Sequence, residues 1–186
     1  MTVMSVRRLL VAGAPGTGKT TVVGVVVARL RAEGLEVGGF VTREVREAGR
    51  RVGFEAVALD GPMATIARVG WATGVRVGRY GVDVAAFEGV ALPAVRRALE
   101  AGRVVVLDEL GLMELVSERF VALVEEVLEA PVAVLATVHR RAHPVTDTIK
   151  ARSDVELVTV TAENRDELPE VLSERLIRWW RSAGRG

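Results

Sequence analysis

The sequence predicts an α/β fold in which a mostly parallel β-sheet is covered by helices on both faces. Short apolar runs alternate along the chain with segments of helical periodicity, and this alternation is typical of parallel sheets. With 186 residues and 49% apolar side chains, the chain is long enough to bury one core. We therefore expect a single domain over residues 1–186, with an antiparallel hairpin inserted at about residues 37–59.

The strands are predicted from short apolar runs that end at turn residues. The first is expected at Leu9–Ala12, and the two arms of the hairpin are expected at 37–46 and 51–59. The segment 60–81 is rich in glycine and contains a proline, so we expect an irregular loop there. Further strands are expected at 103–107, where the apolar run stops on Asp108 and Glu109, at 132–138 and at 155–160.

Helices are predicted between these strands. The first, from about Lys19 to Glu33, is rich in valine and would favour a strand on propensity alone, but the glycine-rich turn before it should lead into a helix. Ser117 is expected to cap a helix that runs to about Glu129. The other helices are expected at Val84–Ala101, with Pro93 as a weak point, and from Glu163 or Asp166 to near Arg181.

The most informative motif follows the first strand and reads Gly13-Ala14-Pro15-Gly16-Thr17-Gly18-Lys19-Thr20. It matches the P-loop, or Walker A motif, whose glycines let backbone N–H groups surround a phosphate at the positive end of the next helix. Lys19 is one of only two lysines in the chain, and it is expected to reach the β- and γ-phosphates. The Thr20 hydroxyl is expected to bind Mg²⁺. The fold class is therefore expected to be that of the P-loop NTPases.

A second motif, Asp108-Glu109, ends an apolar strand as a Walker B motif does. Alone it is consistent with two solvated carboxylates, but a P-loop upstream places it at the edge of the sheet where ligands bind. Asp108 is then expected to hold Mg²⁺ together with Thr20. Glu109 is expected to align or deprotonate the attacking water. Lys19 and Glu109 are thus the predicted catalytic residues, and they favour hydrolysis over transfer to an acceptor.

The base of the nucleotide is not specified by any motif. Residues Asp108 to Gly111 satisfy the Asp-x-x-Gly pattern of regulatory GTPases, but the Asn-Lys-x-Asp motif that reads guanine is missing. We therefore expect ATP, GTP and other nucleoside triphosphates to be hydrolysed to diphosphate and phosphate.

The turn after the strand that ends at 138 contains the candidates for a positively charged group that would face the phosphates from the side opposite Lys19. Thr137 or His139 is a candidate sensor of the γ-phosphate, and Arg140 or Arg141 a candidate arginine finger, although the sequence favours a solvated basic turn. Arg43 and Arg46 are two further arginine-finger candidates. His143 is expected to have a structural role.

Composition excludes several other functions. The chain has no cysteine, so thiolate catalysis and disulfides are absent. A net charge of +1 and the lack of a long apolar run predict neither nucleic-acid binding nor membrane insertion. The C-terminal Trp179 and Trp180 are expected to include one that packs on the sheet, with the neighbouring arginines solvated. A cytoplasmic monomer is expected.

With these motifs in place, the chain resembles the small nucleoside-triphosphatase family that includes the human cancer-related nucleoside-triphosphatase and its bacterial and archaeal relatives. The similarity extends over nearly the whole chain, and its most specific runs are Gly39–Arg46, Gly49–Phe54, Val77–Asp83 and Leu107–Leu115. It implies slow, Mg²⁺-dependent hydrolysis of several nucleoside triphosphates by one compact domain. Besides the P-loop, it implies nucleotide contacts along the strand at Val104, Val105, Val106, Leu107, Asp108, Glu109, Leu110 and Gly111.

Two positions depart from what we expect of this family. Leu112 stands where relatives usually have a lysine, and His139-Arg140-Arg141 stands where they tend to have a proline-containing turn. Two other functions stay open from the residues alone: a small-molecule or nucleoside kinase, with the arginine-rich turn as a lid, and a nucleotide-gated binding module, with the 60–81 loop as its moving surface.

Overall fold

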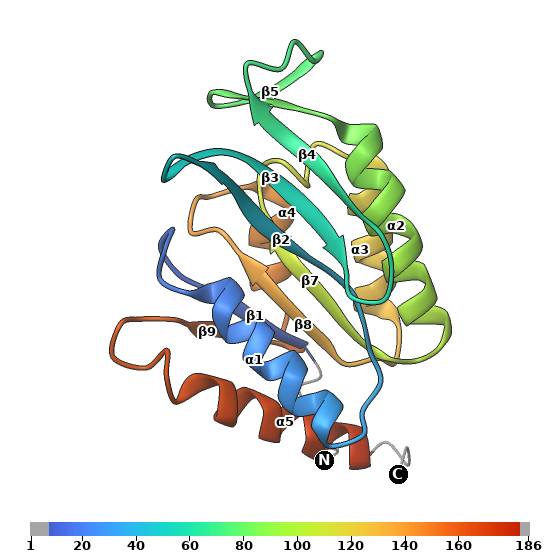
Figure 1. Cartoon of the computed structure of the whole chain (residues 1–186). Helices are drawn as coiled ribbons and strands as arrows, with labels where there is room; N and C mark the ends of the chain where they lie inside the picture. The colour runs from blue at the N-terminus through green and yellow to red at the C-terminus, as the bar shows by residue number, and fades with distance from the viewer. Residues whose placement is uncertain (1–7, 183–186) are drawn as a thin grey trace.

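The computed structural model describes residues 8–182, and in this part of the chain all strands form one sheet (Figure 1). Its nine strands lie in the order β5-β6-β4-β3-β2-β7-β8-β1-β9. The neighbours from β2 to β9 pair in parallel, and those from β5 to β2 pair antiparallel. The bounds are β1 Arg8–Ala12, β2 Val37–Glu47, β3 Arg50–Ala58, β4 Met63–Val69, β5 Val75–Val77, β6 Tyr80–Val82, β7 Val104–Leu110, β8 Val134–Val138 and β9 Val155–Thr159.

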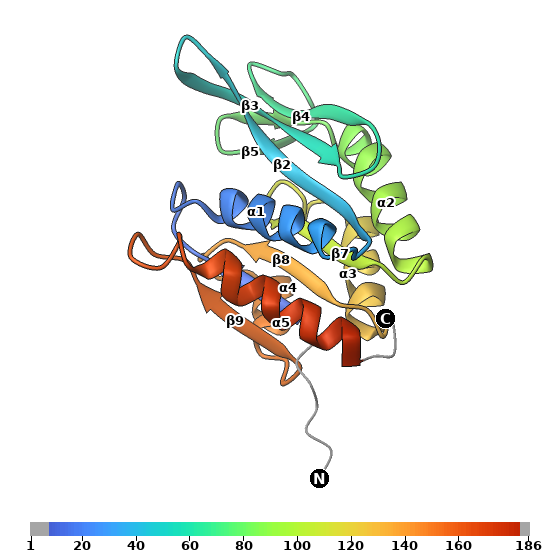
Figure 2. The same ribbon diagram turned by 60° about the horizontal axis from the view of Figure 1, so that its bottom comes forward.

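Helices cover both faces of the sheet, as the sequence predicts. Figures 1 and 2 show α1 and α5 side by side on one face and α2 and α3 on the other. The α/β class with helices on both faces of the sheet is therefore confirmed, whereas the sheet is mixed, with four parallel and four antiparallel pairings among the described strands. The bounds are α1 Lys19–Ala32, α2 Val84–Glu100, α3 Glu118–Glu129, α4 Pro144–Lys150 and α5 Leu168–Ser182. In residues 8–182, no helix is both long and apolar enough to cross a lipid bilayer.

Successive residues of the parallel strands point to opposite faces of the sheet and contribute to two separate hydrophobic cores. On the α2–α3 face, the rings of Phe40, Phe87 and Phe120 meet edge to face, with centroids 5.0–5.6 Å apart. The other core lies under α1, which buries four of the valines that disfavour a helix by propensity. Burial against the sheet and α5 overrides that weak preference, because tertiary packing supplies most of a helix's stability.

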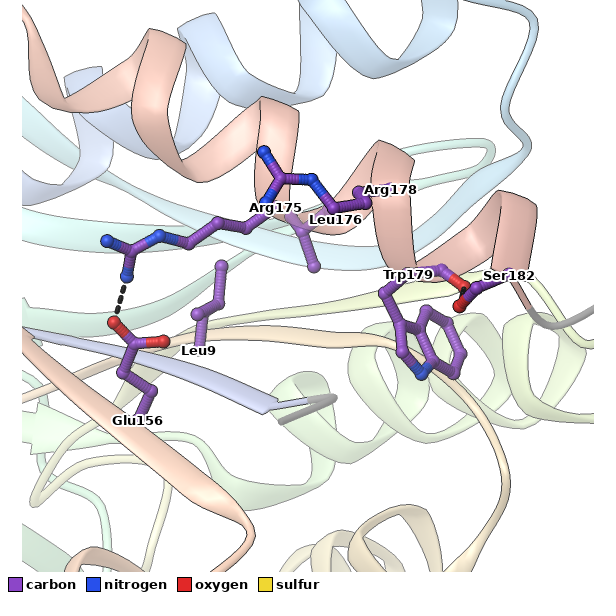
Figure 3. A pocket seen from close by; sticks show the side chains of 7 residues that line it. All are labelled: Leu9, Glu156, Arg175, Leu176, Arg178, Trp179 and Ser182. Carbon is purple, nitrogen blue, oxygen red and sulfur yellow. Dashed lines mark hydrogen bonds and ion pairs between the residues drawn. The ribbon is translucent and has the colours of Figure 1, made fainter. Parts of the chain in front are cut away.

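The C-terminal helix packs as predicted. Figure 3 shows Leu176 and Trp179 of α5 beside Leu9 of β1, and both side chains are buried. Arg175 forms an ion pair with Glu156 of β9 on the exposed side of this contact. One tryptophan thus belongs to the core and the neighbouring arginines are exposed.

The prediction of an irregular loop at 60–81 is wrong. This segment contains β4, β5 and β6, which extend the hairpin into an antiparallel half-sheet. Its glycines lie in the short turns, where Gly70 and Gly78 have positive φ, and at Gly81, whose missing side chain lets the backbone of Trp71 approach. The predicted hairpin is present, but its first strand also pairs in parallel with β7 and so belongs to both halves.

Two boundaries and one helix differ from those predicted. β7 does not stop before Asp108 but continues through it to Leu110, with a register shift against β8 between Leu107 and Leu110. Helix α5 begins at Leu168, because residues 162–167 form turns in which Asn164 caps the Thr161 amide. Helix α4 is not predicted from the sequence, whereas Pro93 is accommodated inside α2.

Candidate active site

The P-loop lies where β1 leads into α1, at the edge of the sheet where the parallel strands end (Figure 1). Gly16 and Gly18 adopt left-handed conformations with φ of 78° and 96°, which lets the chain curl before the helix. The Thr17 hydroxyl closes the turn by donating to the Ala14 carbonyl at 2.8 Å. The result is a compact loop directly before the first turn of α1.

The N-terminus of α1 is open to an anion. Gly18 is its N-cap and provides no side-chain hydrogen bond, and the first turn contains no acidic residue. The first-turn N–H groups and the positive end of the helix dipole are therefore available to a phosphate. Lys19 is 9% exposed, and its Nζ donates to the carbonyls of Gly13 at 3.2 Å and Ala14 at 3.4 Å. The ammonium group thus lies against the inside of the loop.

Asp108 connects strands β7 and β8 of the parallel sheet to the helix that follows the P-loop. It is completely buried, and its Oδ1 accepts hydrogen bonds from Thr137 of β8 at 2.5 Å and from Thr20 of α1 at 3.4 Å. Its Oδ2 is buried with no hydrogen-bond partner in residues 8–182. Burial raises the pKa of this carboxyl, while Thr137, Thr20 and the charge of Lys19 oppose the rise. An unpartnered carboxylate oxygen beside a threonine hydroxyl suits a hard cation such as Mg²⁺.

Glu109 faces the same cleft as Lys19, and a third carboxylate lies next to it. Burial raises the pKa of Glu109, and the nearby Lys19 lowers it while Asp108 raises it further. The side chain of Glu114 is buried, and burial together with Glu109 raises its pKa to about 8. Both carboxylates lie against Gly111, where an added Cβ would be 2.7 Å from Glu114 Oε2 and 3.3 Å from Glu109 Oε1. Glu114 therefore stays protonated near neutral pH.

Two adjoining cavities lie between the P-loop and the antiparallel half of the sheet. One has a volume of about 580 Å³ and the other about 300 Å³. They share five lining residues, which come from the P-loop, β2, β3 and β7: Pro15, Lys19, Thr42, Phe54 and Glu109. The predicted catalytic residues Lys19 and Glu109 therefore face one continuous cleft.

The candidates for a positively charged group opposite Lys19 differ in whether they line the cleft. Arg140 and Arg141 line the smaller cavity with His139, and Arg43 lines the larger one. Arg46 instead forms an ion pair with Glu44 at 2.7 Å and lines neither cavity. Thr137 is buried under Asp108, so its hydroxyl contacts the carboxylate rather than the cleft.

The histidine at 143 is structural, as the sequence predicts. Its Nδ1 accepts from the amide of Val145 and caps α4.

The predicted nucleotide contacts along β7 need a correction. The side chains of Val104 and Val106 lie in the core under α1, and those of Val105, Leu107 and Leu110 lie in the core under α2 and α3. These five residues hold Asp108 and Glu109 at the edge of the sheet and do not themselves line the cleft cavities. Gly111, by contrast, lines the smaller cavity.

Several residues of the cleft were not singled out from the sequence. Phe54 and Thr42 line both cavities, and Glu114 lines the smaller one. Positions 42 and 54 lie on the same face of their strands as the core residues Phe40 and Ala56, and no sequence signal distinguishes a cleft-facing position there from a core position. Glu114 had one available signal, because an acidic residue within an apolar run near a Walker B motif is unusual.

A glycine-rich loop between a strand and a helix, with a buried aspartate on a nearby parallel strand, defines the class of P-loop nucleotide-binding proteins. Comparison with known proteins narrows the class. A family model described as NTPase matches residues 8–173. The chain is 43% identical over 176 residues to nucleoside-triphosphatase THEP1 of Thermofilum pendens, covering 93% of this chain and 97% of that protein.

Two solved structures are similar over most of their length. The crystal structure of THEP1 from Aquifex aeolicus has a TM-score of 0.80 and 34% identity, covering 89% of this chain and 96% of that one. The solution structure of a human cancer-related nucleoside triphosphatase has a TM-score of 0.77 and 38% identity, covering 90% and 96%. The chain belongs to the NTPase family, as its resemblance in sequence indicated.

Proposed function

We propose that the chain is a Mg²⁺-dependent nucleoside-triphosphatase that slowly converts ATP, GTP and other nucleoside triphosphates to diphosphate and phosphate. The observation that carries this proposal is the position of Asp108, whose Oδ1 accepts from Thr20 of the P-loop helix and whose Oδ2 is buried without a partner. The names of the relatives, all nucleoside-triphosphatases, agree with it.

Magnesium would be held by the Thr20 hydroxyl and by Asp108, directly or through water. When bound, it supplies positive charge to the β- and γ-phosphate oxygens. Thr137 keeps Oδ1 of Asp108 fixed through its 2.5 Å hydrogen bond, so that Oδ2 is the oxygen left for other ligands. Mg²⁺ therefore fits the residues present.

The phosphates would bind to the amides from Gly13 to Thr20, with Lys19 moving from the loop carbonyls to the β- and γ-oxygens. Glu109 would accept a proton from the attacking water, and its raised pKa brings it closer to the pH at which a general base works best. Arg140 and Arg141 are candidates for a cation that stabilises the charge on the transferred phosphoryl group, since they line the same cavity as Lys19 and Glu109.

Broad base tolerance is supported by the absence of an Asn-Lys-x-Asp motif in the sequence. In the loop next to the P-loop, Asn164 is occupied by the Thr161 amide and the Thr159 carbonyl, so its side chain is not available to read a base. We further propose that the protein acts as a cytoplasmic monomer on free nucleotides, without nucleic acid or a membrane. The binding-module alternative loses its motivation, because 60–81 forms strands and not a loop.

Phosphate release from purified protein, with Mg²⁺ and a panel of four triphosphates, tests the proposal. We expect acceptor-independent release from several bases, and loss of release when EDTA replaces Mg²⁺. Glu109→Gln should bind a triphosphate normally and lose at least about 100-fold in turnover. Turnover by this variant at the parent rate would refute the role of Glu109, and release only after an alcohol or monophosphate is added would indicate a kinase.

A further inference from the structure

The cleft beside the P-loop extends past the residues that would hold a triphosphate. A triphosphate held by the P-loop needs, on its γ side, room for one water beside Glu109. The cavities of about 580 and 300 Å³ extend beyond that position toward β3, β5 and the segment after β7. Six of the residues that line the larger cavity lie between Pro15 and Thr21 and would hold the triphosphate itself, and the smaller cavity reaches the lower limit of the size of pockets that bind small molecules.

The far wall of this cleft is apolar and includes a fixed aromatic ring. It is formed by four half-buried side chains: Phe54, Val77, Leu112 and Met113. The Phe54 ring meets Tyr80 edge to face at 5.2 Å, and the Arg51 guanidinium lies 5.3 Å from its centroid. Tyr80 is itself held by hydrogen bonds from Arg51 and Arg79, both at 3.1 Å. Phe54 is therefore a pre-organised surface for a planar group.

Cations without counter-ions surround this wall. The side chains of Arg43, Arg140 and Arg141 line the cavities and make no hydrogen bond or ion pair with any residue in the described part of the chain. Guanidinium groups bind phosphate oxygens in a bidentate manner, so three of them favour a phosphorylated ligand.

The carboxylates of the cleft do not cancel these charges. Glu44 is paired with Arg46 at 2.7 Å and Arg51 at 2.8 Å. Glu114 holds its proton near neutral pH, as shown by its pKa of about 8. Glu109 lines both cavities together with the positively charged Lys19. The uncompensated charge on the far side is therefore positive.

We propose that this cavity is a second ligand site, which binds a phosphate monoester attached to a planar, largely apolar group, the chemistry of a nucleoside monophosphate. The phosphate would bind Arg43 and the planar group would lie against Phe54, so that Arg140 and Arg141 stay available to the triphosphate. The site rests on the proposed function, because the first ligand on the P-loop is the triphosphate. It is occupied together with that triphosphate, not in competition with it.

Calorimetry on the full chain tests this site. The protein is saturated with Mg²⁺ and a non-hydrolysable ATP analogue, so that the P-loop is filled, and is then titrated with AMP. We expect one AMP per chain, with adenosine and inorganic phosphate each binding at least about tenfold more weakly, because each lacks one half of the ligand. Absence of AMP binding, or displacement of the analogue by AMP, would overturn the proposal.

A pair of variants on one strand identifies the site. Arg43→Ala removes an unpaired cation of the cavity, and should weaken AMP by about tenfold or more. Arg46→Ala removes a neighbouring arginine that is paired with Glu44 and lies outside the cavity, and should change AMP affinity less than about twofold. Equal effects would refute the assigned position. If triphosphate is hydrolysed but AMP does not bind, only the second site fails, whereas a lack of phosphate release removes the proposed function itself.

Discussion

Thr137 and Asp108 are joined by a buried hydrogen bond of 2.5 Å that connects the ends of β8 and β7. The hydroxyl donates to Oδ1, and the other oxygen of the carboxylate stays without a partner in the described residues. Thr137 thereby fixes Oδ1, the oxygen that also accepts from Thr20 of the P-loop helix. Under the proposed function, Thr137 would orient a ligand of the metal and would not contact the γ-phosphate.

Replacing Thr137 tests this orientation. Thr137→Val keeps the shape and removes the donor, and we expect the Mg²⁺ concentration for half-maximal phosphate release to rise about tenfold. Thr137→Ser retains the hydroxyl and should stay within about threefold of the parent. Identical Mg²⁺ titrations for the valine variant and the parent would show that the hydrogen bond does not orient Asp108.

The two lysines of the chain allow a matched comparison. Lys19→Ala removes the ammonium beside the P-loop carbonyls, and should abolish phosphate release with little change in thermal unfolding. Lys150→Ala removes an ammonium that pairs with Asp147 on the short helix α4, and should keep the parent rate. A surviving rate in the Lys19 variant would contradict the assignment of the phosphate site.

An alanine substitution should have different effects at two glycines, one in the P-loop and one in the helix that follows it. A Cβ on Gly13 would lie 2.6 Å from the Thr17 hydroxyl and 3.2 Å from the Val160 carbonyl, so Gly13→Ala should weaken triphosphate binding by at least about tenfold. Gly24 lies exposed within α1 with open space around it, and Gly24→Ala should stabilise the protein by about 0.5–1 kcal/mol. Nucleotide titrations and chemical denaturation measure the two effects. A normal affinity in the Gly13 variant would mean that the loop relaxes around the methyl group.

Glu114 should make the stability of the nucleotide-free protein depend on pH. Its pKa is about 8 when folded, above the ordinary value of 4.5, so the folded state holds a proton that the unfolded state releases. This contribution is complete below pH 4.5, decreases as the pH rises, and is lost once the pH passes about 8. Glu114→Gln should flatten this slope in urea titrations between pH 5 and 8.5, whereas Glu125→Gln, at an exposed position of α3, should not. An unchanged slope in the Glu114 variant would show that another group is responsible.

The P-loop, the Walker B aspartate and the alternating strands and helices were predictable because each depends on local pattern. The segment 60–81 was not, since its strands consist of short, weakly apolar runs that are ordered by pairing with β3 and with each other. The partners of Asp108 were equally hidden, because Thr137 and Thr20 meet it only through the order β7-β8-β1 of the sheet. Glu114 was missed because its proton depends on Glu109 and on burial, which the sequence does not display.

The valine-rich helix α1 has a consequence for how the protein responds to its ligand. Because its residues disfavour a helix in isolation, the first turn that receives the phosphate forms only when the sheet and α5 are already packed against it. The binding site is then absent from the unfolded chain. A ligand that binds only the folded state shifts the folding equilibrium toward that state. The free energy of unfolding should therefore rise with the concentration of nucleotide.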